Sequence, residues 1–284
     1  MPTPISRFPA DASRDAIAAA LTETGAVIVE GVLDRDTIAA LNAEIDAFLG
    51  DRPPTHEYMN ELVEIFYGGT TRHMPGLAGK SHIFRRDILC REIFTAICDR
   101  VLKPSCATYQ LNFADVMERG PGSTRQLLHR DDGVWHYMPR PSPELEFASM
   151  TALGEFTAEM GATLVAPGSH RWDRTREATP EELVVAELEP GSSVFYLGST
   201  IHAAGANVTK DKWRRGMHLS YCLGWLRTQD NNYLTAPLEI ARTLPKAQQA
   251  MLGYGVHDAY QDGGGFLGAV GWLDPIQLMD EGRL

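Results

Sequence analysis

Several features that would assign this chain of 284 residues to a common class are missing from it. No apolar run approaches the roughly 20 residues of a membrane-spanning helix, and the first ten residues lack the basic stretch and apolar core of a secretory signal. Positive charge is also scarce, because 26 Lys and Arg stand against 37 Asp and Glu. The net charge of −11 argues against a general binder of nucleic acid or anionic membrane. We therefore expect a cytoplasmic protein with neither as a partner.

Cysteine is sparse and unpaired in sequence. Cys90, Cys98, Cys106 and Cys222 form no C-x-x-C spacing, so neither a zinc knuckle nor a redox pair is predicted. Four cysteines in a chain of this length fit buried, reduced thiols. Linker-like Ser/Gly/Pro stretches and charge blocks are missing as well, so we predict one domain over residues 1–284.

The first part of that domain, residues 1–106, is predicted to hold helices, one strand and a loop. Residues 12–24 are rich in helix formers, and residues 25–31 form a β-branched run between glycines, typical of a buried strand. Asp34 stands at an N-cap position before apolar residues at helical spacing, which end at Gly50.

Residues 51–80 contain paired prolines, glycines and threonines together with aromatics. Long loops in compact domains are often lids, so we interpret this stretch as a candidate substrate cover, with an ordinary surface connection as the alternative. Helical periodicity returns over residues 87–101.

Residues 107–226 read as short β-like runs separated by Gly/Pro turns. The fold class predicted is mainly β with flanking helices, around a double-stranded β-helix (jelly-roll or cupin-like) core that can hold a metal in its mouth. Residues 227–284 are predicted to be a helical extension. The expected strands lie near 107–117, 126–131, 147–156, 162–166, 184–189, 193–197 and 214–226.

His129, Asp131 and His202 are the candidate metal ligands. Side chains at i and i+2 share one face of a strand, so His129 and Asp131 would point the same way. His202 follows an apolar run, residues 194–197, that the fold can bring alongside. Two imidazoles and one carboxylate are typical of iron(II) oxygenases, because they leave three coordination positions open.

These residues also allow other interpretations. His129-Arg130-Asp131 matches the H-R-D of kinases, but that motif needs Asn where His136 stands, and no phosphate loop or Asp-Phe-Gly is present. We interpret His136, His170 and His218 as structural rather than as ligands. A zinc hydrolase that uses the same ligands, and a non-catalytic jelly-roll binding protein, remain as alternatives.

Arg214 and Arg215 follow His202 by a dozen residues. An arginine binds a carboxylate bidentately and stays charged when buried. Strand alternation puts Arg214 and His218 on one face and Arg215 and Tyr221 on the other, so only one arginine can face the metal. Two exposed surface arginines would be the alternative.

Together these segments resemble the phytanoyl-CoA dioxygenase (PhyH) family of Fe(II)/2-oxoglutarate-dependent oxygenases. The resemblance runs over nearly the whole chain and looks closest to secondary-metabolite members, of the fumitremorgin B endoperoxidase and fungal meroterpenoid types. The segments that carry it are Gly25–Gly31, Gln126–Asp131, Gly161–His170, His202 with Asn207, Arg214–Tyr221 and Gly224–Arg227, followed by Asp230–Leu234.

The resemblance implies a role for each matching residue. His129, Asp131 and His202 would bind Fe(II), and Arg214 would grip the distal carboxylate of 2-oxoglutarate. Two polar residues, Gln126 and Thr163, would assist. Tyr221 falls where some relatives place a tyrosine near the iron. The presence of Asp131 favours hydroxylase-type chemistry over halogenation, with O2 consumed and succinate and CO2 released.

The expected substrate is a small, largely apolar secondary metabolite. A CoA thioester would need Lys and Arg around its phosphates, and no basic cluster stands in the loop-rich stretch, so an acyl-CoA hydroxylase is the alternative. The aromatic and apolar residues predicted to line the substrate pocket are Tyr58, Phe66, Met74, Trp135 and Tyr137. A homodimer is also considered.

Overall fold

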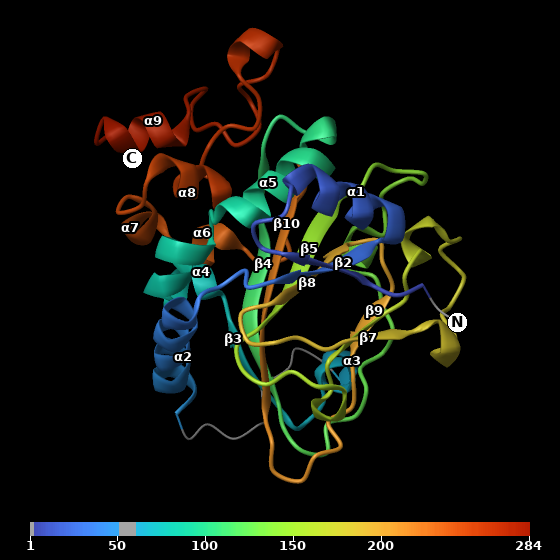
Figure 1. Ribbon diagram of the computed structural model, residues 1–284. Helices are drawn as coiled ribbons and strands as arrows, with labels where there is room; N and C mark the ends of the chain where they lie inside the picture. The colour runs from blue at the N-terminus through green and yellow to red at the C-terminus, as the bar shows by residue number, and fades with distance from the viewer. Residues whose placement is uncertain (1–2, 51–60) are drawn as a thin grey trace.

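A computed structural model describes residues 3–50 and 61–284 of the protein (Figure 1). The N-terminal part begins with strand β1 and continues through a helix, a strand and a second helix. Helix α2 confirms the predicted caps, because the Asp34 side chain accepts from the Thr37 amide at 2.8 Å and Gly50 follows the last turn. These elements are β1 (Ser6–Pro9), α1 (Arg14–Thr24), β2 (Ala26–Glu30) and α2 (Arg35–Leu49).

The described part of the loop-rich stretch contains regular structure. Its first helix, α3, has no fully buried residue, and the strand that follows joins the edge of the main sheet beside β4. The elements up to the β-rich part are α3 (Glu61–Tyr67), β3 (Thr71–Pro75), α4 (Leu77–Lys80), a π-helical turn (Phe84–Ile88) and α5 (Glu92–Val101).

Two sheets form the β-rich part, which is the predicted double-stranded β-helix. The large sheet has the order β1-β2-β8-β5-β10-β4-β3, and the small sheet has the order β7-β6-β9. The remaining strands of the large sheet are β4 (Tyr109–Arg119), β5 (Glu146–Ala152), β8 (Ser193–Leu197) and β10 (Arg214–Leu223). Those of the small sheet are β6 (Thr163–Val165), β7 (Val184–Ala186) and β9 (His202–Ala204).

Strand alternation divides the apolar side chains between two cores. On β8, for example, Phe195 packs with the N-terminal helices, whereas Val194 and Tyr196 face the space between the two sheets. On β10, Leu219 belongs to the helix-covered side. The helices therefore bury one face of the large sheet and leave its other face to the small sheet and to the cavity described below.

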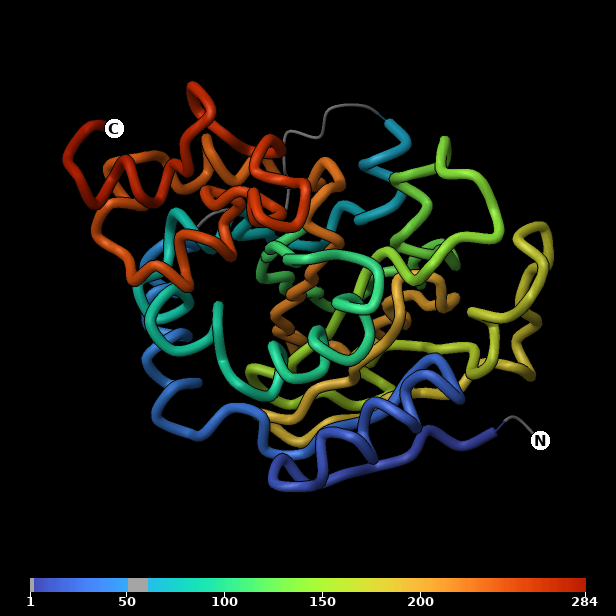
Figure 2. Tube along the Cα trace, turned by 90° about the horizontal axis from the view of Figure 1, so that it is seen from above, coloured from blue at the N-terminus to red at the C-terminus, as the bar shows by residue number. Residues whose placement is uncertain are grey.

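The C-terminal segment packs beside the N-terminal half of β4 and the end of β10. Figures 1 and 2 show it gathered at the side of the molecule opposite the N-terminus. Its helices are α6 (Asn232–Thr235), α7 (Leu238–Ala241), α8 (Lys246–Met251) and α9 (Pro275–Asp280). Within the described ranges, no helix combines the length and apolarity that crossing a membrane requires.

Three sequence expectations about strands are corrected. Residues 126–131 form no regular strand: His129 makes an isolated bridge with His202, and a 3-10 turn begins at Asp131. His202 starts a short strand of its own, β9. Strands β1 and β3 were not expected, because their sequences contain Pro and Arg rather than a β-branched run.

Candidate active site

His129 and His202 lie directly opposite each other in the backbone. Each donates its amide to the other's carbonyl, at 3.1 and 3.0 Å, so the two histidines form one hydrogen-bonded pair. Asp131 follows at the start of its 3-10 turn. Its Oδ1 lies 3.4 Å from His129 Nε2 and 3.5 Å from His202 Nε2. The three ligand atoms all lie within 4.8 Å of one another, as a single metal ion requires.

The backbone also sets the orientation of both imidazoles. The Nδ1–H of His129 donates to the Leu127 carbonyl at 2.8 Å, and that of His202 donates to the Thr200 carbonyl at 3.1 Å. A carbonyl can only accept, so each ring has its proton on Nδ1 and its lone pair on Nε2, toward the common centre. Such outer hydrogen bonds are typical of metal-binding histidines.

The electrostatics of the three residues fit a divalent cation. Burial alone would raise the pKa of Asp131, but His202, His129 and His218 together hold that pKa well below its usual range. Burial lowers the pKa of His202 to about 4, against the opposing effect of Asp131. A carboxylate that stays ionised and an imidazole that stays neutral are the forms that bind metal. The donor set therefore fits iron(II).

His218 on β10 contacts the second oxygen of the same carboxylate. Its Nε2 lies 3.6 Å from Asp131 Oδ2, and the side chain is nearly buried. The carboxylate of Asp131 raises the pKa of His218 above its ordinary value, although burial acts in the opposite direction. Asp131 is thus approached on Oδ1 by the two other ligands and on Oδ2 by His218.

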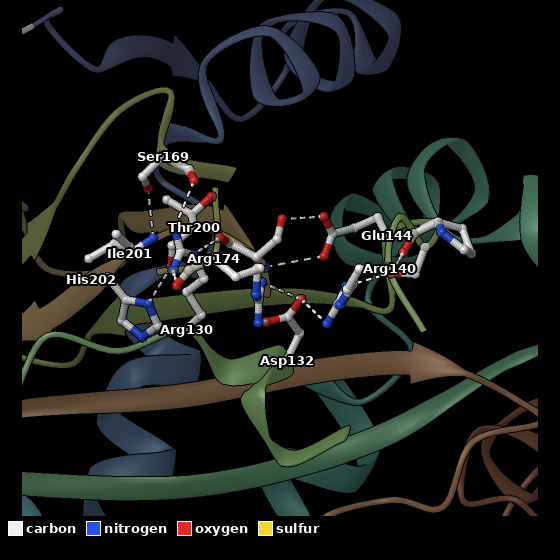
Figure 3. Close-up of polar contacts among 12 residues, drawn as sticks. Arg130, Asp132, Arg140, Glu144, Ser169, Arg174, Thr200, Ile201 and His202 are labelled. Carbon is white, nitrogen blue, oxygen red and sulfur yellow. Dashed lines mark hydrogen bonds and ion pairs between the residues drawn. The ribbon is translucent and has the colours of Figure 1, made fainter. Parts of the chain in front are cut away.

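A polar network behind the three candidate ligands holds their two segments together (Figure 3). Arg130 donates to three backbone carbonyls: Ser199 at 2.9 Å, Ser169 at 3.2 Å and Arg174 at 3.3 Å. The neighbouring carboxylate of Asp132 is fully buried and accepts from both Arg140 and Arg174. Through these contacts, the segment with His129 and Asp131 is fixed to the segment before His202.

Arg214 is a fully buried charge. The guanidinium lies 4.5 Å from the centre of the Phe156 ring, and its Nε has no hydrogen-bond partner among the described residues. Burial and the nearby Arg119 lower the pKa of Arg214. Arg215 points the other way, to Glu118 at 2.6 Å and Asp46 at 2.6 Å. Of the two arginines, Arg214 is therefore the one available to an anionic ligand.

One cavity of about 710 Å³ joins these features. Gln126 and Thr163 line it with the three candidate ligands and Arg214. The Gln126 side chain accepts from the Ala204 amide at 3.0 Å, which orients it beside β9. The cavity is lined by Leu62, Val63, Phe66, Tyr67, Phe113, Met117, Gln126, His129, Arg130, Asp131, Gly133, Val134, Met150, Thr163, Tyr196, His202, Ala203, Ala204, Arg214, His218, Gln229 and Asp230.

Tyr221 does not lie in this cavity, which corrects the expectation of a tyrosine near the iron. Its hydroxyl donates to the Leu89 carbonyl at 2.8 Å, and its ring packs near Phe94 on the helix-covered face. The physical reason is the alternation of β10, which directs Tyr221 away from the side that carries Arg214 and His218.

The predicted substrate-lining residues divide in the same way. Phe66 lines the cavity, and its ring lies 4.7 Å from that of His129. Met74 is buried in the other core, Trp135 donates to the Arg227 carbonyl at 2.9 Å outside the cavity, and Tyr137 is exposed. Tyr58 lies outside the described residues.

His218 and Asp230 are cavity residues that sequence reasoning did not place there. His218 was interpreted as structural, although it shares the strand parity of Arg214 four residues earlier, and that parity was the available signal. Asp230 begins a segment that resembles the family, but the sequence did not place it in the cavity, because its position depends on the turn after β10. The other two histidines are outside the cavity: His136 is exposed, and His170 Nε2 lies 3.1 Å from the Thr22 carbonyl.

Comparisons with known proteins agree with this geometry. A family model described as Phytanoyl-CoA dioxygenase (PhyH) matches residues 21–216. Dioxygenase aneA from Aspergillus aculeatus is 37% identical, over 82% of this chain and 80% of that protein. Dioxygenase cdmD from Talaromyces verruculosus is 34% identical, over 82% and 81%. The epimerase SnoN, solved with Fe3+, alpha ketoglutarate and nogalamycin RO, has the same fold at 21% identity, with a TM-score of 0.60 over 76% of this chain and 86% of that one.

Proposed function

Because the chain belongs to the phytanoyl-CoA dioxygenase (PhyH) family and is a non-heme iron, 2-oxoglutarate-dependent dioxygenase, we propose that His129, Asp131 and His202 bind its iron. Arg214 then binds the distal carboxylate of 2-oxoglutarate. A single observation supports this assignment: a fully buried arginine without a carboxylate partner among the described residues opens on the same cavity as the ligand cluster. A dicarboxylate would supply the charge that this arginine lacks.

The residues around the cavity have separate tasks in this proposal. Arg214 fixes one end of 2-oxoglutarate by paired hydrogen bonds, and Gln126 and Thr163 offer polar groups along the same wall. The apolar lining from α3 and β4 excludes water and protects a reactive intermediate. When bound, iron and 2-oxoglutarate supply the oxidising chemistry, which consumes O2, releases succinate and CO2, and oxidises a C–H bond.

The proposed substrate is a small secondary metabolite. Relatives such as aneA and cdmD are named only as dioxygenases, so their substrates are not transferred to this chain. The alternative, an acyl-CoA hydroxylase, would need several cations for the CoA phosphates. In the described lining of the cavity, the only Lys or Arg residues are Arg130 and Arg214, and Arg130 already donates to three carbonyls.

Two adjacent arginines provide a matched test. Arg214→Gln and Arg215→Gln remove the same charge from opposite faces of β10. We expect Arg214→Gln to weaken 2-oxoglutarate binding by roughly 30-fold or more, as for a truncated buried charge pair, and Arg215→Gln to leave it unchanged. The measurement is anaerobic titration calorimetry with Fe(II) present, followed by succinate detection after O2 is admitted. Equal affinities for wild type and Arg214→Gln would contradict the assignment.

We also propose the domain organisation, the location and the partner of the protein. The described elements serve one oxygenase domain, with the jelly-roll core at 107–226 between the N-terminal part and the C-terminal helices. A cytoplasmic location follows from the acidic composition and the four free cysteines, since disulfides are rare there. The partner is a small molecule, with a second copy of the chain as a possible addition.

A further inference from the structure

Asp230 is the cavity charge that the proposed iron and 2-oxoglutarate sites do not use. Among the lining residues, His129, Asp131 and His202 are the iron ligands, and Arg214 is committed to 2-oxoglutarate. The other acidic, basic and histidine residues of the described lining are Arg130, His218 and Asp230. Arg130 donates to three carbonyls and His218 contacts Asp131, so both have protein partners.

The backbone around Asp230 is held firmly against β4. The Gln229 amide donates to Asn112 Oδ1 at 2.8 Å, and the Asp230 amide donates to the Asn112 carbonyl at 3.1 Å. No hydrogen bond or ion pair to the Asp230 carboxylate is formed by any residue that the structure describes. The carboxylate is therefore positioned at the cavity wall without serving the loop that carries it.

Its surroundings disfavour that negative charge on balance. Burial, followed by the nearby carboxylate of Asp115, raises the pKa of Asp230 to about 6. Asp115 is fully buried on β4, and one of its oxygens has no hydrogen-bond partner in the described chain. Lys80 and His218 act on Asp230 in the opposite direction, but both have other partners. Lys80 donates to the Pro75 carbonyl, and His218 approaches Asp131. A partly buried carboxylate in this state gains from a cationic partner.

Aromatic and apolar side chains line the cavity that Asp230 also lines. Phe113 and Met117 lie on the same face of β4 as Asp115, two residues before and after it, and both line the cavity. Helix α3 contributes Phe66 and Tyr67 to the same lining. Aromatic faces attract cations through their quadrupole, and a desolvated carboxylate beside them adds a full opposite charge. This combination recognises an ammonium group.

We infer that the substrate is an apolar ring compound with a protonated amine, and that the Asp230 carboxylate holds this ammonium between Phe113 and the aromatic side chains of α3. The inference rests on the proposed function, because it assigns Asp230 to the substrate once iron and 2-oxoglutarate occupy the other charged groups. Asp230 acts as a specificity-determining residue, and the distance from its carboxylate to the iron then selects which carbon of the substrate is oxidised.

Paired probes that differ only in charge test the inference. Tryptamine and its alcohol tryptophol, and phenethylamine and its alcohol, are titrated calorimetrically into the anaerobic protein loaded with Fe(II) and 2-oxoglutarate. We expect at least one amine to bind roughly tenfold more tightly than its alcohol, as a cation–π contact with a desolvated charge would give. No preference for either amine, including no binding of any probe, would overturn the inference.

Two variants assign the preference to its residue. Asp230→Asn keeps the size of the side chain and removes its charge, so the amine should lose its advantage over the alcohol. Asp262→Asn makes the same change at an exposed position outside the cavity and should keep the wild-type preference. A preference retained in Asp230→Asn, or lost equally in Asp262→Asn, would contradict the inference.

The affinity for 2-oxoglutarate, measured in the same samples, separates the two proposals. If it is normal while the amine preference is missing, the substrate class is wrong and the iron site stands. If 2-oxoglutarate fails to bind the wild-type protein, the proposed function itself is wrong. Should Asp230→Asn fail to fold, the wild-type comparison of amine with alcohol still decides the question.

Discussion

At the scale of single residues, Arg214 is a buried charge that forms no ion pair with any residue the structure describes. Such a group costs folding free energy that a ligand restores on binding. We expect Arg214→Met to stabilise the protein free of metal and 2-oxoglutarate by about 1 to 4 kcal/mol, because an apolar side chain replaces an unpaired charge beside Phe156. Urea unfolding of the free proteins measures this difference. A less stable variant would mean that the arginine is satisfied without a ligand.

The same pair of proteins should respond oppositely to 2-oxoglutarate. Wild type with Fe(II) should gain about 2.7 kcal/mol at a concentration one hundred times the dissociation constant. With an affinity roughly 30-fold weaker, the Arg214→Met variant should gain about 0.9 kcal/mol or less at that concentration. Stability and ligand binding are thus opposed at this one position.

His218 is expected to orient the iron-binding carboxylate, because its Nε2 approaches Asp131 Oδ2 rather than the ligand oxygen Oδ1. Replacing His218 by Leu should weaken Fe(II) binding about 10- to 100-fold, as is typical when a partner of a metal ligand is lost. Gln at this position keeps an N–H donor and should recover part of the affinity. Metal-competition titration under anaerobic conditions measures both.

The exposed His136 provides the control for this experiment. His136→Leu removes an imidazole close in sequence to the ligands and should leave the affinity for Fe(II) unchanged. If His218→Leu binds Fe(II) as wild type does, the contact with Asp131 has no orienting role.

At the scale of elements, the 3-10 turn that carries Asp131 depends on the buried Asp132. Arg140 and Arg174 converge on this carboxylate from two different loops. Asp132→Asn should lower the free energy of unfolding by about 1.5 to 3 kcal/mol, the range for hydrogen bonds to charged groups, and should also weaken Fe(II) binding. Asp173→Asn, at an exposed carboxylate nearby, should change neither quantity in the same denaturation and metal titrations.

Helix α3 packs on the protein without burying any residue completely. None of its residues is fully buried, and Phe66 packs against the ring of His129. We expect the amides of residues 61–67 to exchange with solvent much faster than those of β10, and to slow when Fe(II) and 2-oxoglutarate bind. Hydrogen exchange read by mass spectrometry tests this, with β10 as the internal reference. Protection equal to that of β10 in the free protein would contradict it.

Elements with a regular pattern were predictable from sequence, and those that depend on distant partners were not. Helix α2 was identified from Asp34 to Gly50 because its capping residues and apolar spacing are local. The segment with His129 was expected to be a strand, but its backbone pairs only with His202, far along the chain, and then turns. Edge strand β3 was missed because its place depends on pairing with β4.

The ligand cluster was predictable for a similar reason. His129 and Asp131 are only two residues apart in sequence, and two histidines with one carboxylate indicate which metal the site fits. The outer residues were less accessible, since the parity of β10 indicates a face for His218 but not its contact with Asp131. Asp230 lies in the cavity only because the turn after β10 is anchored to Asn112, which nothing in the local sequence indicates.

At the scale of the whole molecule, two buried groups whose pKa values shift in opposite directions on folding set the pH range in which the metal-free protein is most stable. Burial and the charge of Asp131 raise the pKa of Glu146 to about 8 from an unfolded value of 4.5. The folded state therefore binds this proton more tightly than the unfolded chain does. Its contribution to stability is complete below about pH 4.5 and is lost as the pH rises through about 8.

His202 has the opposite dependence. Its pKa falls from 6.5 to about 4 on folding, so the unfolded chain binds that proton more tightly, and stability is lost as the pH falls from 6.5 toward 4. The two opposite slopes cancel between these unfolded values, so we expect metal-free stability to be greatest from about pH 4.5 to 6.5. Glu146→Gln should flatten the alkaline side and leave the acid side unchanged in chemical denaturation series. An unchanged alkaline slope would show that Glu146 does not control it.

The paired amides of His129 and His202 have a consequence for how the molecule can vary. Both ends of the segment between them are tied by the same two hydrogen bonds, so the intervening chain is a closed loop that leaves and returns at the proposed iron site. Closing a longer loop costs little more, because the entropy depends only on the logarithm of its length. Insertions at the exposed turns of this segment would therefore change the surroundings of the iron without moving the two histidines apart. New chemistry can arise there while the metal centre is inherited intact.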